Sequence, residues 1–410
     1  MNPPDASQPG RSVRRIRLLT LSQAESEMQR IGCHPEGISI MAPKAVFRVL
    51  KIEGLSPFQA NVLKQEMLSH GADAATAAGC IDCTCKKSDV LLFGTVSQLR
   101  QVCEKLKQQP ASFQPIAREI LRILEKKAVP RQWKIRDRTL KLGERTLIMG
   151  ILNVTPDSFS DGGRYFEPLD AVDHALRLEQ EGADILDIGG ESTRPGSDPV
   201  SEEEEKRRVL PILEALQGKT RLPVSIDTCK SGVAREALER GACIVNDVTA
   251  LKGDPEMPGV CSQYGAGVVL MHMLGRPKTM QKNPKYKDVV EEVAAFLQER
   301  VRDAEGAGIS GDSILVDPGI GFGKILEHNL ALIRAIPYLE EETGKPVLMG
   351  ISRKRFIGEL TGAPVGERLP GTLAAAVACA LHRAAVVRVH DVKASRAAIR
   401  VAEALREPHS

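Results

Sequence analysis

Aromatic side chains are scarce in this sequence: Phe, Trp and Tyr make up 3% of its 410 residues, and there is a single Trp. Such a chain offers few flat surfaces on which nucleic-acid bases could stack. The formal net charge of +3 gives no support to nucleic-acid binding either. No apolar run approaches the roughly 20 residues that a membrane-spanning helix needs. We therefore expect small molecules as partners, with no nucleic acid and no membrane.

The N-terminus and the cysteines both indicate a cytoplasmic protein. The first ten residues are polar, contain prolines and resemble no signal peptide, and residues 1–13 have the composition of a disordered segment. The nine cysteines are an odd number spread over a long chain. That usage fits reduced thiols better than a disulfide framework.

Residues 1–130 are predicted to form a separate, smaller α/β domain, in which strand-like and helix-like apolar patterns alternate. They contain no catalytic constellation, so the role of this domain stays open. The cluster Cys80-x2-Cys83-x-Cys85 could hold a metal or an iron–sulfur cluster, with Cys33 or Cys103 as a further ligand. Against this, a fourth ligand at regular spacing is missing, and free cysteines often serve as small buried apolar residues.

Residues 131–410 are predicted to form a (β/α)8 TIM barrel that begins with a hairpin. Two alternating runs between Trp133 and Met149 surround Gly143-Glu144, which predicts a hairpin turn there and a plug for one end of the barrel. Eight strand-like runs then alternate with amphipathic helical stretches over about 265 residues, the usual size of such a barrel. The strands are expected at 147–152, 185–188, 224–227, 244–246, 268–272, 314–317, 347–350 and 386–390. A doubly wound open sheet is the alternative, but it seldom has eight uniform units without a fingerprint turn.

The stretch Asp317-Pro-Gly-Ile-Gly-Phe-Gly-Lys324 is the most informative turn of this barrel. Three glycines in five residues let the backbone approach a ligand closely. Neither the phosphate-loop spacing nor the G-x-G-x-x-G dinucleotide spacing is present, and Ile325 stands where a phosphate loop has a hydroxyl residue. We therefore expect a ligand-facing strand end of another kind.

Polar residues follow or end every one of the eight predicted strands, where a barrel gathers its catalytic groups. They are Asn153, Glu191 to Pro195, Asp227, Asn246 with Asp247, His272, Asp317, Ser352 to Lys354, and Arg388 with His390. Helix capping is an equally good interpretation of Asp247 or Ser352 taken alone. His272, between two methionines, is better explained as a core histidine. Capping does not explain Lys354, Arg388 and His390, which have no acceptor to offer when charged, so the set indicates a mouth for an anion and a flat polar heterocycle.

Five of these segments together resemble the dihydropteroate synthase family. They are Asn153-Val-Thr-Pro-Asp-Ser-Phe-Ser-Asp-Gly-Gly163, Glu191-Ser-Thr-Arg-Pro-Gly196, Asp317 to Lys324, Ser352-Arg-Lys354 and Arg388-Val-His-Asp391. The resemblance covers roughly residues 131–410 and leaves the N-terminal domain as an addition. It implies a transferase of folate biosynthesis, in which 4-aminobenzoate displaces pyrophosphate from (7,8-dihydropterin-6-yl)methyl diphosphate to give 7,8-dihydropteroate.

The resemblance also implies roles for single residues, Mg2+ as cofactor, a homodimer and a sulfonamide target. The pterin is expected at Asp227, Asn246, Asp317, Lys354, Met271 and Phe322. The diphosphate is expected at Asn153, Arg388 and His390, with Asn153 as the metal contact. The aminobenzoate is expected at Phe159, Thr193, Arg194, Pro195, Phe322 and Ser352. The catalytic set is expected to be Asp161, Asp227, Lys354, Arg388 and His390.

Two other functions remain compatible with a pterin-binding barrel. A methyltetrahydrofolate-dependent methyltransferase shares the fold, but it has no need for the cations Lys354, Arg388 and His390. A pterin-binding protein without chemistry would have a damaged first or second loop, and both loops look intact. One position departs from the family pattern: Arg355 stands where some members carry a small hydroxyl residue, so its role is open.

Overall fold

The computed structural model describes residues 16, 18, 21–125, 129–154, 168–192, 197–275, 279–281 and 283–406. The chain divides into two compact units, the first formed by residues 1–126 with 407–410 and the second by residues 127–406. In the described ranges, no helix combines the length and the apolar character needed to cross a membrane.

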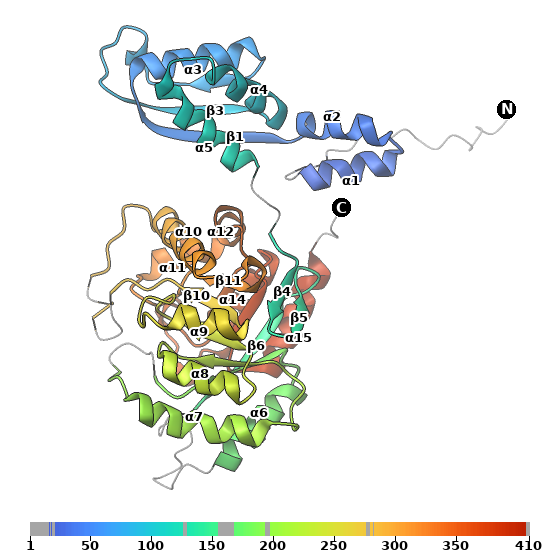
Figure 1. The fold of residues 1–410 in the computed structure, drawn as a ribbon, viewed down its shortest axis with the longest axis vertical. Coiled ribbons are helices and arrows are strands. Elements are labelled where there is room, and N and C mark those ends of the chain that lie inside the picture. Colours follow the sequence, from blue (N-terminus) through green and yellow to red (C-terminus); the bar gives the residue numbers. More distant parts are fainter. Residues whose placement is uncertain are drawn as a thin grey trace, which may run out of the picture. The chain divides into compact units, whose positions relative to one another are not determined.

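The N-terminal unit contains a three-stranded antiparallel sheet against which helices pack (Figure 1). Its strands are β1 (Phe47–Leu55), β2 (Asp73–Ala75) and β3 (Ser88–Thr95), in the order β1-β3-β2. Its helices are α1 (Leu21–Ile31), α2 (Pro35–Ala45), α3 (Pro57–Ser69), α4 (Val96–Leu106) and α5 (Gln114–Leu124). Capping boxes at Ser56 and Thr95 fix the starts of α3 and α4, because each hydroxyl accepts a backbone N–H that the helix leaves unpaired.

Eight parallel strands form the sheet of the second unit. They are β6 (Leu147–Asn153), β7 (Ile185–Gly189), β8 (Val224–Asp227), β9 (Ile244–Asp247), β10 (Gly267–Met271), β11 (Ile314–Asp317), β12 (Leu348–Gly350) and β13 (Val386–Val389). Neighbours in sequence are neighbours in the sheet, and β13 returns to pair with β6. A parallel bridge between Val316 and Val347 joins β11 to β12 and closes the barrel, which confirms the predicted (β/α)8 fold.

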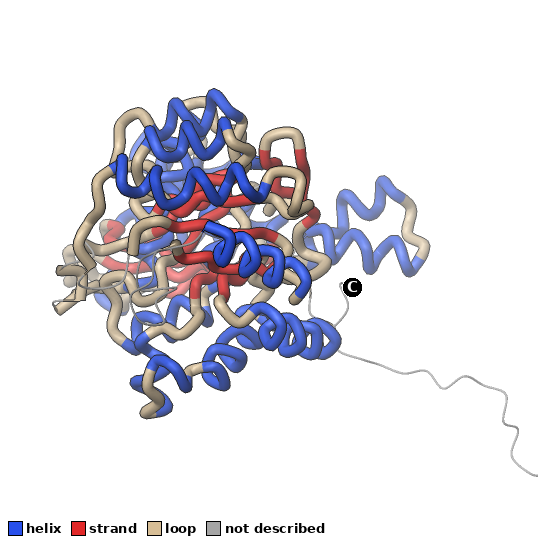
Figure 2. The backbone as a smooth tube through the Cα atoms, turned by 90° about the horizontal axis from the view of Figure 1, so that it is seen from below, coloured by secondary structure: helices blue, strands red, loops and turns tan. Residues whose placement is uncertain are grey.

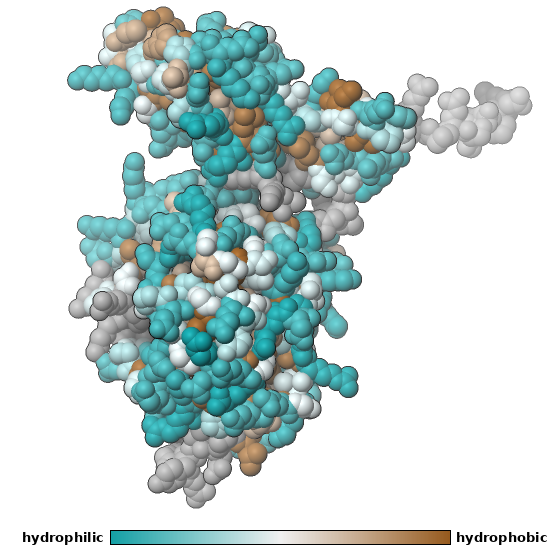
Figure 3. All heavy atoms as spheres, in the orientation of Figure 1, coloured by the Kyte–Doolittle hydropathy of each residue, from teal (hydrophilic) through white to brown (hydrophobic). Residues whose placement is uncertain are grey.

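Helices surround these strands, as Figure 2 shows. They are α6 (Pro168–Gln180), α7 (Glu202–Leu216), α8 (Ser231–Glu239), α9 (Met257–Tyr264), α10 (Val289–Gly306), α11 (Leu326–Arg334), α12 (Ile336–Thr343), α13 (Arg355–Thr361), α14 (Leu369–Leu381) and α15 (Val392–Leu405). Their apolar faces and the outer faces of the strands form one large core. On the face visible in Figure 3 the surface of this unit is mainly hydrophilic.

A hairpin closes the amino-terminal end of the barrel, but its turn is not where the sequence pattern placed it. Strands β4 (Gln132–Ile135) and β5 (Arg138–Lys141) pair around a turn at Arg136 and Asp137, so the predicted turn at Gly143-Glu144 is wrong. Arg136 adopts a left-handed φ of 57°, which is unusual for a residue with a side chain. Tertiary contacts hold it there, since its N–H donates to the Gly265 carbonyl and its guanidinium donates to the carbonyls of Leu238, in the last turn of α8, and of Ala242, just after that helix.

The hairpin, predicted as a plug for one end of the barrel, has one apolar, buried face, while Gln132 and Lys134 on its other face are exposed. Trp133 and Ile135 are both 0% exposed and pack against inward-facing residues of the barrel strands, among them Ile185 and Val269. The indole N–H of Trp133 donates to the Ser313 carbonyl at 2.9 Å. Pairing that donor removes the cost of burying it. The hairpin therefore seals one end of the barrel and leaves the other end to bind a ligand.

Candidate active site

The carboxyl ends of the strands bring the predicted polar residues to one rim. The parallel register places Asp227 of β8 opposite Asn246 of β9 and next to Gly189 of β7. On the same rim, Met271 of β10 lies opposite Asp317 of β11. The rim therefore collects carboxylates, an amide and an apolar side chain around one opening.

Arg388 of β13 is the electrostatic centre of this opening. Its Nε donates to Oδ2 of Asp187 at 2.5 Å, and its Nη2 donates to Oδ2 of Asp227 at 2.7 Å. Asn246 also donates to Asp187 Oδ2, at 3.2 Å. Asp187 is completely buried and Asp227 nearly so, while the arginine side chain keeps 20% exposure. One guanidinium of β13 thus bonds to carboxylates of β7 and β8, two and three strands away in the barrel.

The pKa values of Asp227 and Arg388 are both shifted strongly from their ordinary values. Burial raises the pKa of Asp227 to about 7, against the attraction of Arg388. The same carboxylates raise the pKa of Arg388 further, despite its burial, so the guanidinium stays charged. Oδ1 of Asp187 is buried and has no hydrogen-bond partner in the described structure. Ionisable groups with shifted pKa values thus gather at the carboxyl-terminal rim of the barrel, and such groups are typical of functional sites.

The glycine turn after β11 is shaped around Asp317. Oδ1 of Asp317 accepts the Gly319 N–H at 2.7 Å, and burial raises the pKa of this carboxyl while that hydrogen bond and Lys354 oppose the shift. Gly319, Gly321 and Gly323 all have φ between 66° and 83°. A Cβ on Gly319 would lie 1.9 Å from the His272 carbonyl oxygen, and one on Gly323 would lie 2.6 Å from that of Leu274. Glycine is therefore required by contact at 319 and 323, as well as by backbone conformation.

Phe322 and Met271 form a small apolar cluster at the mouth, together with Val248 and Met280. Both are buried, at 8% and 4% exposure. The ammonium of Lys354 lies 4.2 Å from the centre of the Phe322 ring, a distance typical of a cation–π contact. Phe322 thus contacts both the apolar cluster of Met271 and the ammonium of Lys354, and the pterin-binding role of the three residues stays a prediction.

Lys324, the last residue of the glycine turn, is buried at 3% exposure. Its ammonium nitrogen lies 2.9 Å from Nδ1 of His272 and donates to the Phe322 carbonyl at 3.0 Å. Burial lowers the pKa of Lys324 to about 7, and burial with Lys324 lowers that of His272 to about 3. His272 is therefore a neutral, buried acceptor, in agreement with the core interpretation of its sequence context.

Two residues from the last loops complete the described rim. Nδ1 of His390 lies 3.0 Å from the Ser352 hydroxyl, which also accepts the His390 N–H. Ser352 thus orients the imidazole and does not cap α13, whose N-cap is Lys354.

Asn153 ends β6 half-buried and pairs in register with Gly189. Arg355 points elsewhere, since it forms a surface ion pair with Glu359.

Asp247, at the end of β9, is engaged in local hydrogen bonds. Both carboxylate oxygens of Asp247 accept local donors, from Thr249 and from the Leu251 N–H, so it holds the turn after β9. Asp247 therefore stabilises a turn and is not a helix cap, since the next helix, α9, begins only at Met257. Five predicted site residues lie outside the described ranges: Phe159, Asp161, Thr193, Arg194 and Pro195.

Sequence reasoning missed Asp187 and Lys324, and a second buried ion cluster. The signal for Asp187 was a charged residue inside the apolar run Ile185-Leu186-Asp187-Ile188, two positions before the rim. The second cluster is Lys230, whose ammonium contacts Glu191 and, at 2.5 Å, the fully buried Glu205. Glu191 begins the second loop, so this cluster ties the base of that loop to the start of α8 and to α7.

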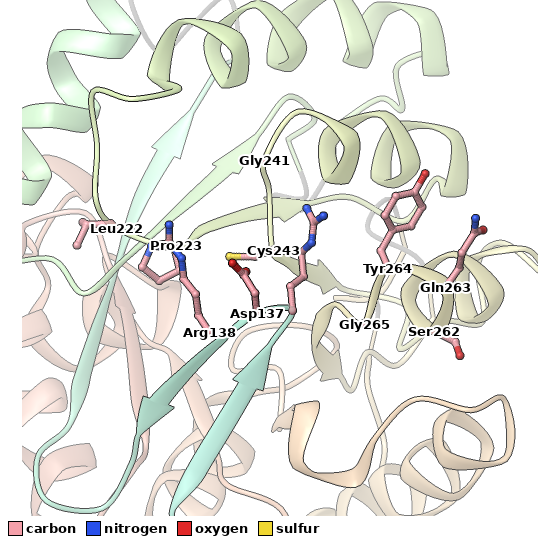
Figure 4. Close-up of a pocket in the computed structure, with 11 residues that line it drawn as sticks. Asp137, Arg138, Leu222, Pro223, Gly241, Cys243, Ser262, Gln263, Tyr264 and Gly265 are labelled. Carbon is pink, nitrogen blue, oxygen red and sulfur yellow. The ribbon is translucent and has the colours of Figure 1, made fainter.

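A cavity of about 710 Å3 lies away from this rim, beside the hairpin turn. Figure 4 shows Asp137 and Arg138 near Cys243 and Pro223, with Tyr264 and Gln263 further along the cavity. Its cations are already engaged: Arg138 donates to the Arg221 carbonyl and Arg136 to the end of α8. The cavity belongs to the seam between the plug and the barrel, and the perturbed groups lie at the other end.

Comparison with known proteins distinguishes the barrel unit from the N-terminal unit. Residues 149–390 match the family described as pterin binding enzyme. The dihydropteroate synthase of Neisseria meningitidis serogroup B is 52% identical over 267 residues, which are 64% of this chain and 93% of that protein. A Halobacterium salinarum protein named "Probable bifunctional folylpolyglutamate synthase/dihydropteroate synthase" is 42% identical over 392 residues, which are 94% of this chain and 46% of that protein. That match extends into the N-terminal unit.

Solved structures give the same result for the barrel. Dihydropteroate synthase of Xanthomonas albilineans with 4-aminobenzoic acid superimposes with a TM-score of 0.63 at 48% identity, covering 67% of this chain and 98% of that one. The same enzyme in complex with 7,8-dihydropteroate gives a TM-score of 0.60 at 45% identity, with the same coverage.

Proposed function

The chain belongs to the pterin binding enzyme family and is a dihydropteroate synthase. From this premise we propose which residues of its barrel mouth bind each part of the substrates. The enzyme condenses (7,8-dihydropterin-6-yl)methyl diphosphate with 4-aminobenzoate and releases pyrophosphate. The observation that carries the proposal is the Arg388 centre: one guanidinium holds two buried carboxylates in a mouth that also contains Asp317 and Lys354.

The pterin ring fits the acceptors of the rim. A reduced pterin presents a row of N–H donors beside a carbonyl acceptor, and Asp227, Asn246 and Asp317 supply carboxylate and amide groups at matching strand ends. Lys354 donates to the carbonyl side and balances the negative charge of Asp317. Phe322 and Met271 cover the ring faces. Burial of these groups makes their hydrogen bonds selective, since an analogue without a matching donor leaves a buried carboxylate unpaired.

The diphosphate is assigned to Arg388 and His390. Arg388 already donates two N–H groups to Asp187 and Asp227, so its role is double: it compensates the charge of these carboxylates and offers its remaining N–H donors to the phosphates. His390, oriented by Ser352, donates beside it. Departure of pyrophosphate leaves a cationic methylene conjugated with the pterin, and the Asp227 carboxylate lies on the rim to stabilise that charge. Asp161 is assigned the same role from the first loop.

Mg2+ is proposed as cofactor, and the donors present fit it. Asn153 offers an amide oxygen at the end of β6, and hard oxygen ligands of this type suit Mg2+. Within the described ranges, no group of three His, Cys, Asp or Glu side chains could hold a metal by itself. The diphosphate oxygens and water would therefore complete the coordination, and the bound ion would supply charge neutralisation to the leaving group.

The aminobenzoate is assigned to Ser352 and Phe322, with Phe159, Thr193, Arg194 and Pro195 from the two loops. Its amine is nucleophilic when neutral, so the reaction needs no strong base at the mouth. Dihydropteroate synthase structures from other organisms hold 4-aminobenzoate and sulfonamide compounds. We propose the same subsite here, and hence inhibition by sulfonamides.

Three broader assignments accompany this function. We propose that residues 1–130 are an accessory domain and residues 131–410 the catalytic barrel, in a cytoplasmic enzyme. We also propose a homodimer through α14 and α15, which pack on each other and expose Leu381, Val401 and Leu405. Light scattering of the purified chain tests the dimer, and a monomeric mass at micromolar concentration contradicts it.

The decisive activity test uses the purified full chain with Mg2+, the pterin diphosphate and radiolabelled 4-aminobenzoate. We expect labelled dihydropteroate and an equal amount of pyrophosphate. Product at the background level of an enzyme-free control contradicts the function. Pyrophosphate release without labelled product contradicts only the assigned aminobenzoate subsite.

A further inference from the structure

The N-terminal unit holds two thiols close together in the segment between β2 and β3. Sγ of Cys80 and Sγ of Cys85 lie 3.7 Å apart. Cys80 ends the short 3-10 helix Ala78–Cys80, and Cys85 lies five residues later. We propose that Cys80 and Cys85 form a reversible dithiol–disulfide pair, which makes this loop a redox-sensitive modification site of the accessory domain.

The loop itself holds the two sulfurs together. The Cys85 N–H donates to the Gly79 carbonyl at 3.3 Å, which closes the chain into a tight ring. Asn61 of α3 donates to the Cys80 carbonyl at 2.7 Å and fixes one end. A Cβ on Gly79 would lie 3.1 Å from the backbone nitrogen and 3.3 Å from Cβ of Cys85. The approach of the two cysteines is therefore built into the backbone and does not depend on side-chain rotation alone.

Exposure distinguishes the three cysteines of this loop. Cys80 is buried, Cys85 is half-buried and Cys83 is exposed. The Cys83 sulfur lies 4.0 Å from the Cys80 carbonyl oxygen. An oxidant therefore reaches Cys85 from solvent, and the buried Cys80 thiol is next to it as the resolving group. Cys83 is exposed in the same loop and serves as the internal comparison.

The oxidation balances with a peroxide as the oxidant. The Cys85 thiolate attacks one peroxide oxygen, the O–O bond breaks, and a sulfenic acid and a hydroxide form. The Cys80 sulfur then attacks the Cys85 sulfur, the S–S bond forms, the S–O bond breaks, and the second hydroxide leaves. Two protons from the thiols convert the hydroxides to water. Two sulfurs have lost two electrons together, and a thiol reductant returns them by exchange.

The surroundings of Cys85 predict a slow reaction. Burial and the hydrogen bond with Cys80 raise the pKa of Cys85, and the carboxylate of Asp82 acts in the same direction. Since only the thiolate attacks peroxide, oxidation is expected to be slower than that of cysteines with a depressed pKa. The pair therefore responds to sustained oxidant and not to brief exposure.

The test maps disulfides in the full chain after treatment with hydrogen peroxide. The oxidised protein is unfolded in denaturant, thiols that remain free are alkylated there, the protein is digested without reductant, and the peptides are identified by mass spectrometry. We expect a Cys80–Cys85 linkage within one chain, the loss of both alkylation sites, and full return of both sites after dithiothreitol. Cys83→Ser should give the same linkage, and Cys85→Ser should abolish it and leave Cys80 as an alkylated free thiol.

Three outcomes overturn the proposal. Cys80 and Cys85 could both remain alkylated as thiols while Cys83 is oxidised, or the linkage could join Cys83 or Cys33 in place of one member of the pair. Native mass spectrometry could also reveal a metal ion that is lost with Cys80→Ala and with Cys85→Ser, which would make the cluster a metal site. Because Cys80 is buried, Cys85→Ser is the primary variant, and circular dichroism verifies that each variant is folded.

Discussion

Two layers of the barrel interior, separated by two residues along the same strands, have opposite chemistry. The lower layer contains Ile185, Ile244, Leu315 and Val386, and packs on Trp133 of the hairpin. Two positions further on, the same strands carry Asp187, Asn246, Asp317 and Arg388. Because side chains alternate along a strand, both sets point inward, about 7 Å apart at 3.3 Å per residue.

The comparison shows how the fold supports buried charge. The lower layer supplies stability and excludes water from below, whereas the upper layer contains ion pairs that contribute little stability by themselves. Substitutions in the two layers should therefore have different effects. Those in the upper layer should lower catalytic activity, and those in the lower layer should lower the unfolding free energy. The four predictions below test that separation, from the largest expected effect to the smallest.

Arg388→Ala should have the largest effect, and it is the one substitution expected to lower both activity and stability. It removes the phosphate-facing charge, so kcat/KM for the pterin diphosphate should fall on the order of a thousandfold. It also leaves Asp187 and Asp227 uncompensated, which should cost about 3–5 kcal/mol of unfolding free energy. Steady-state kinetics and urea denaturation measure the two effects.

Arg388→Lys is the matched control, because it keeps the charge and loses the two-armed geometry. It should recover most of the stability and little of the activity. The KM for the pterin diphosphate should rise far more than the KM for aminobenzoate in both variants. Equal increases in the two KM values would contradict a phosphate role for Arg388.

Trp133→Ala tests the lower layer. Trp133 is 0% exposed, so removal of the indole should cost about 3–5 kcal/mol of unfolding free energy. The kcat of the folded fraction should stay within about twofold of the parent, since the rim is untouched. Trp133→Phe, which keeps a ring and loses the hydrogen bond to Ser313, should lose less stability. A large fall in kcat with little loss of stability would show that the layers are coupled.

Gly319→Ala tests the shape of the glycine turn, with Gly321→Ala as its control. Both positions have positive φ and share a backbone cost of about 1–2 kcal/mol. Only position 319 adds a clash with the His272 carbonyl, because the nearest atom at 321 is Cδ of Lys354 at 3.4 Å. Pterin affinity, measured by calorimetry, should fall about 10–100-fold further for Gly319→Ala. Equal losses in the two variants would assign the effect to backbone strain alone.

The pH dependence of stability should report Asp227. A carboxyl whose pKa is higher in the folded state contributes stability that is fully present below its unfolded pKa and is lost as pH rises through the folded value. For Asp227 that window runs from about pH 4, its ordinary pKa, to about pH 7. Across it, the unfolding free energy of the parent should fall by about 1 kcal/mol or more relative to Asp227→Asn. Parallel curves for the two proteins would place the titration elsewhere.

Much of the barrel could be predicted from sequence because its strands are short, apolar and bounded by turns. The predicted bounds of β8 and β11 agree with the structure, and the others differ by one or two residues. The hairpin turn could not be placed, because Arg136 adopts its left-handed conformation through contacts with α8 and Gly265, far away in sequence. In the N-terminal domain the sequence pattern predicted helices at 23–31, 57–69, 96–108 and 115–126, and it missed α2, because Pro43 lies inside that helix and glycine and proline lie near its start.

Site residues could be predicted where a polar residue ends a strand. The contacts between them could not be predicted, because each joins segments that are far apart in the sequence. Asp227, Asn246 and Asp317 are visible as rim residues in the sequence. That Arg388 bonds to Asp187 and Asp227 follows from barrel closure, which brings β13 near β7 and β8. The pairing of Lys324 with His272 likewise joins two loops that are separated by 52 positions in the chain. Spacing in sequence carries no signal for either contact.

The most direct test of the account is a crystal structure of the full chain with the pterin diphosphate bound. We expect the ring between Asp227, Asn246, Asp317 and Lys354, one face on Phe322 and Met271, and the phosphates at Arg388 and His390. Pterin density in the cavity beside Arg138 and Cys243, with the rim empty, would contradict the central claim.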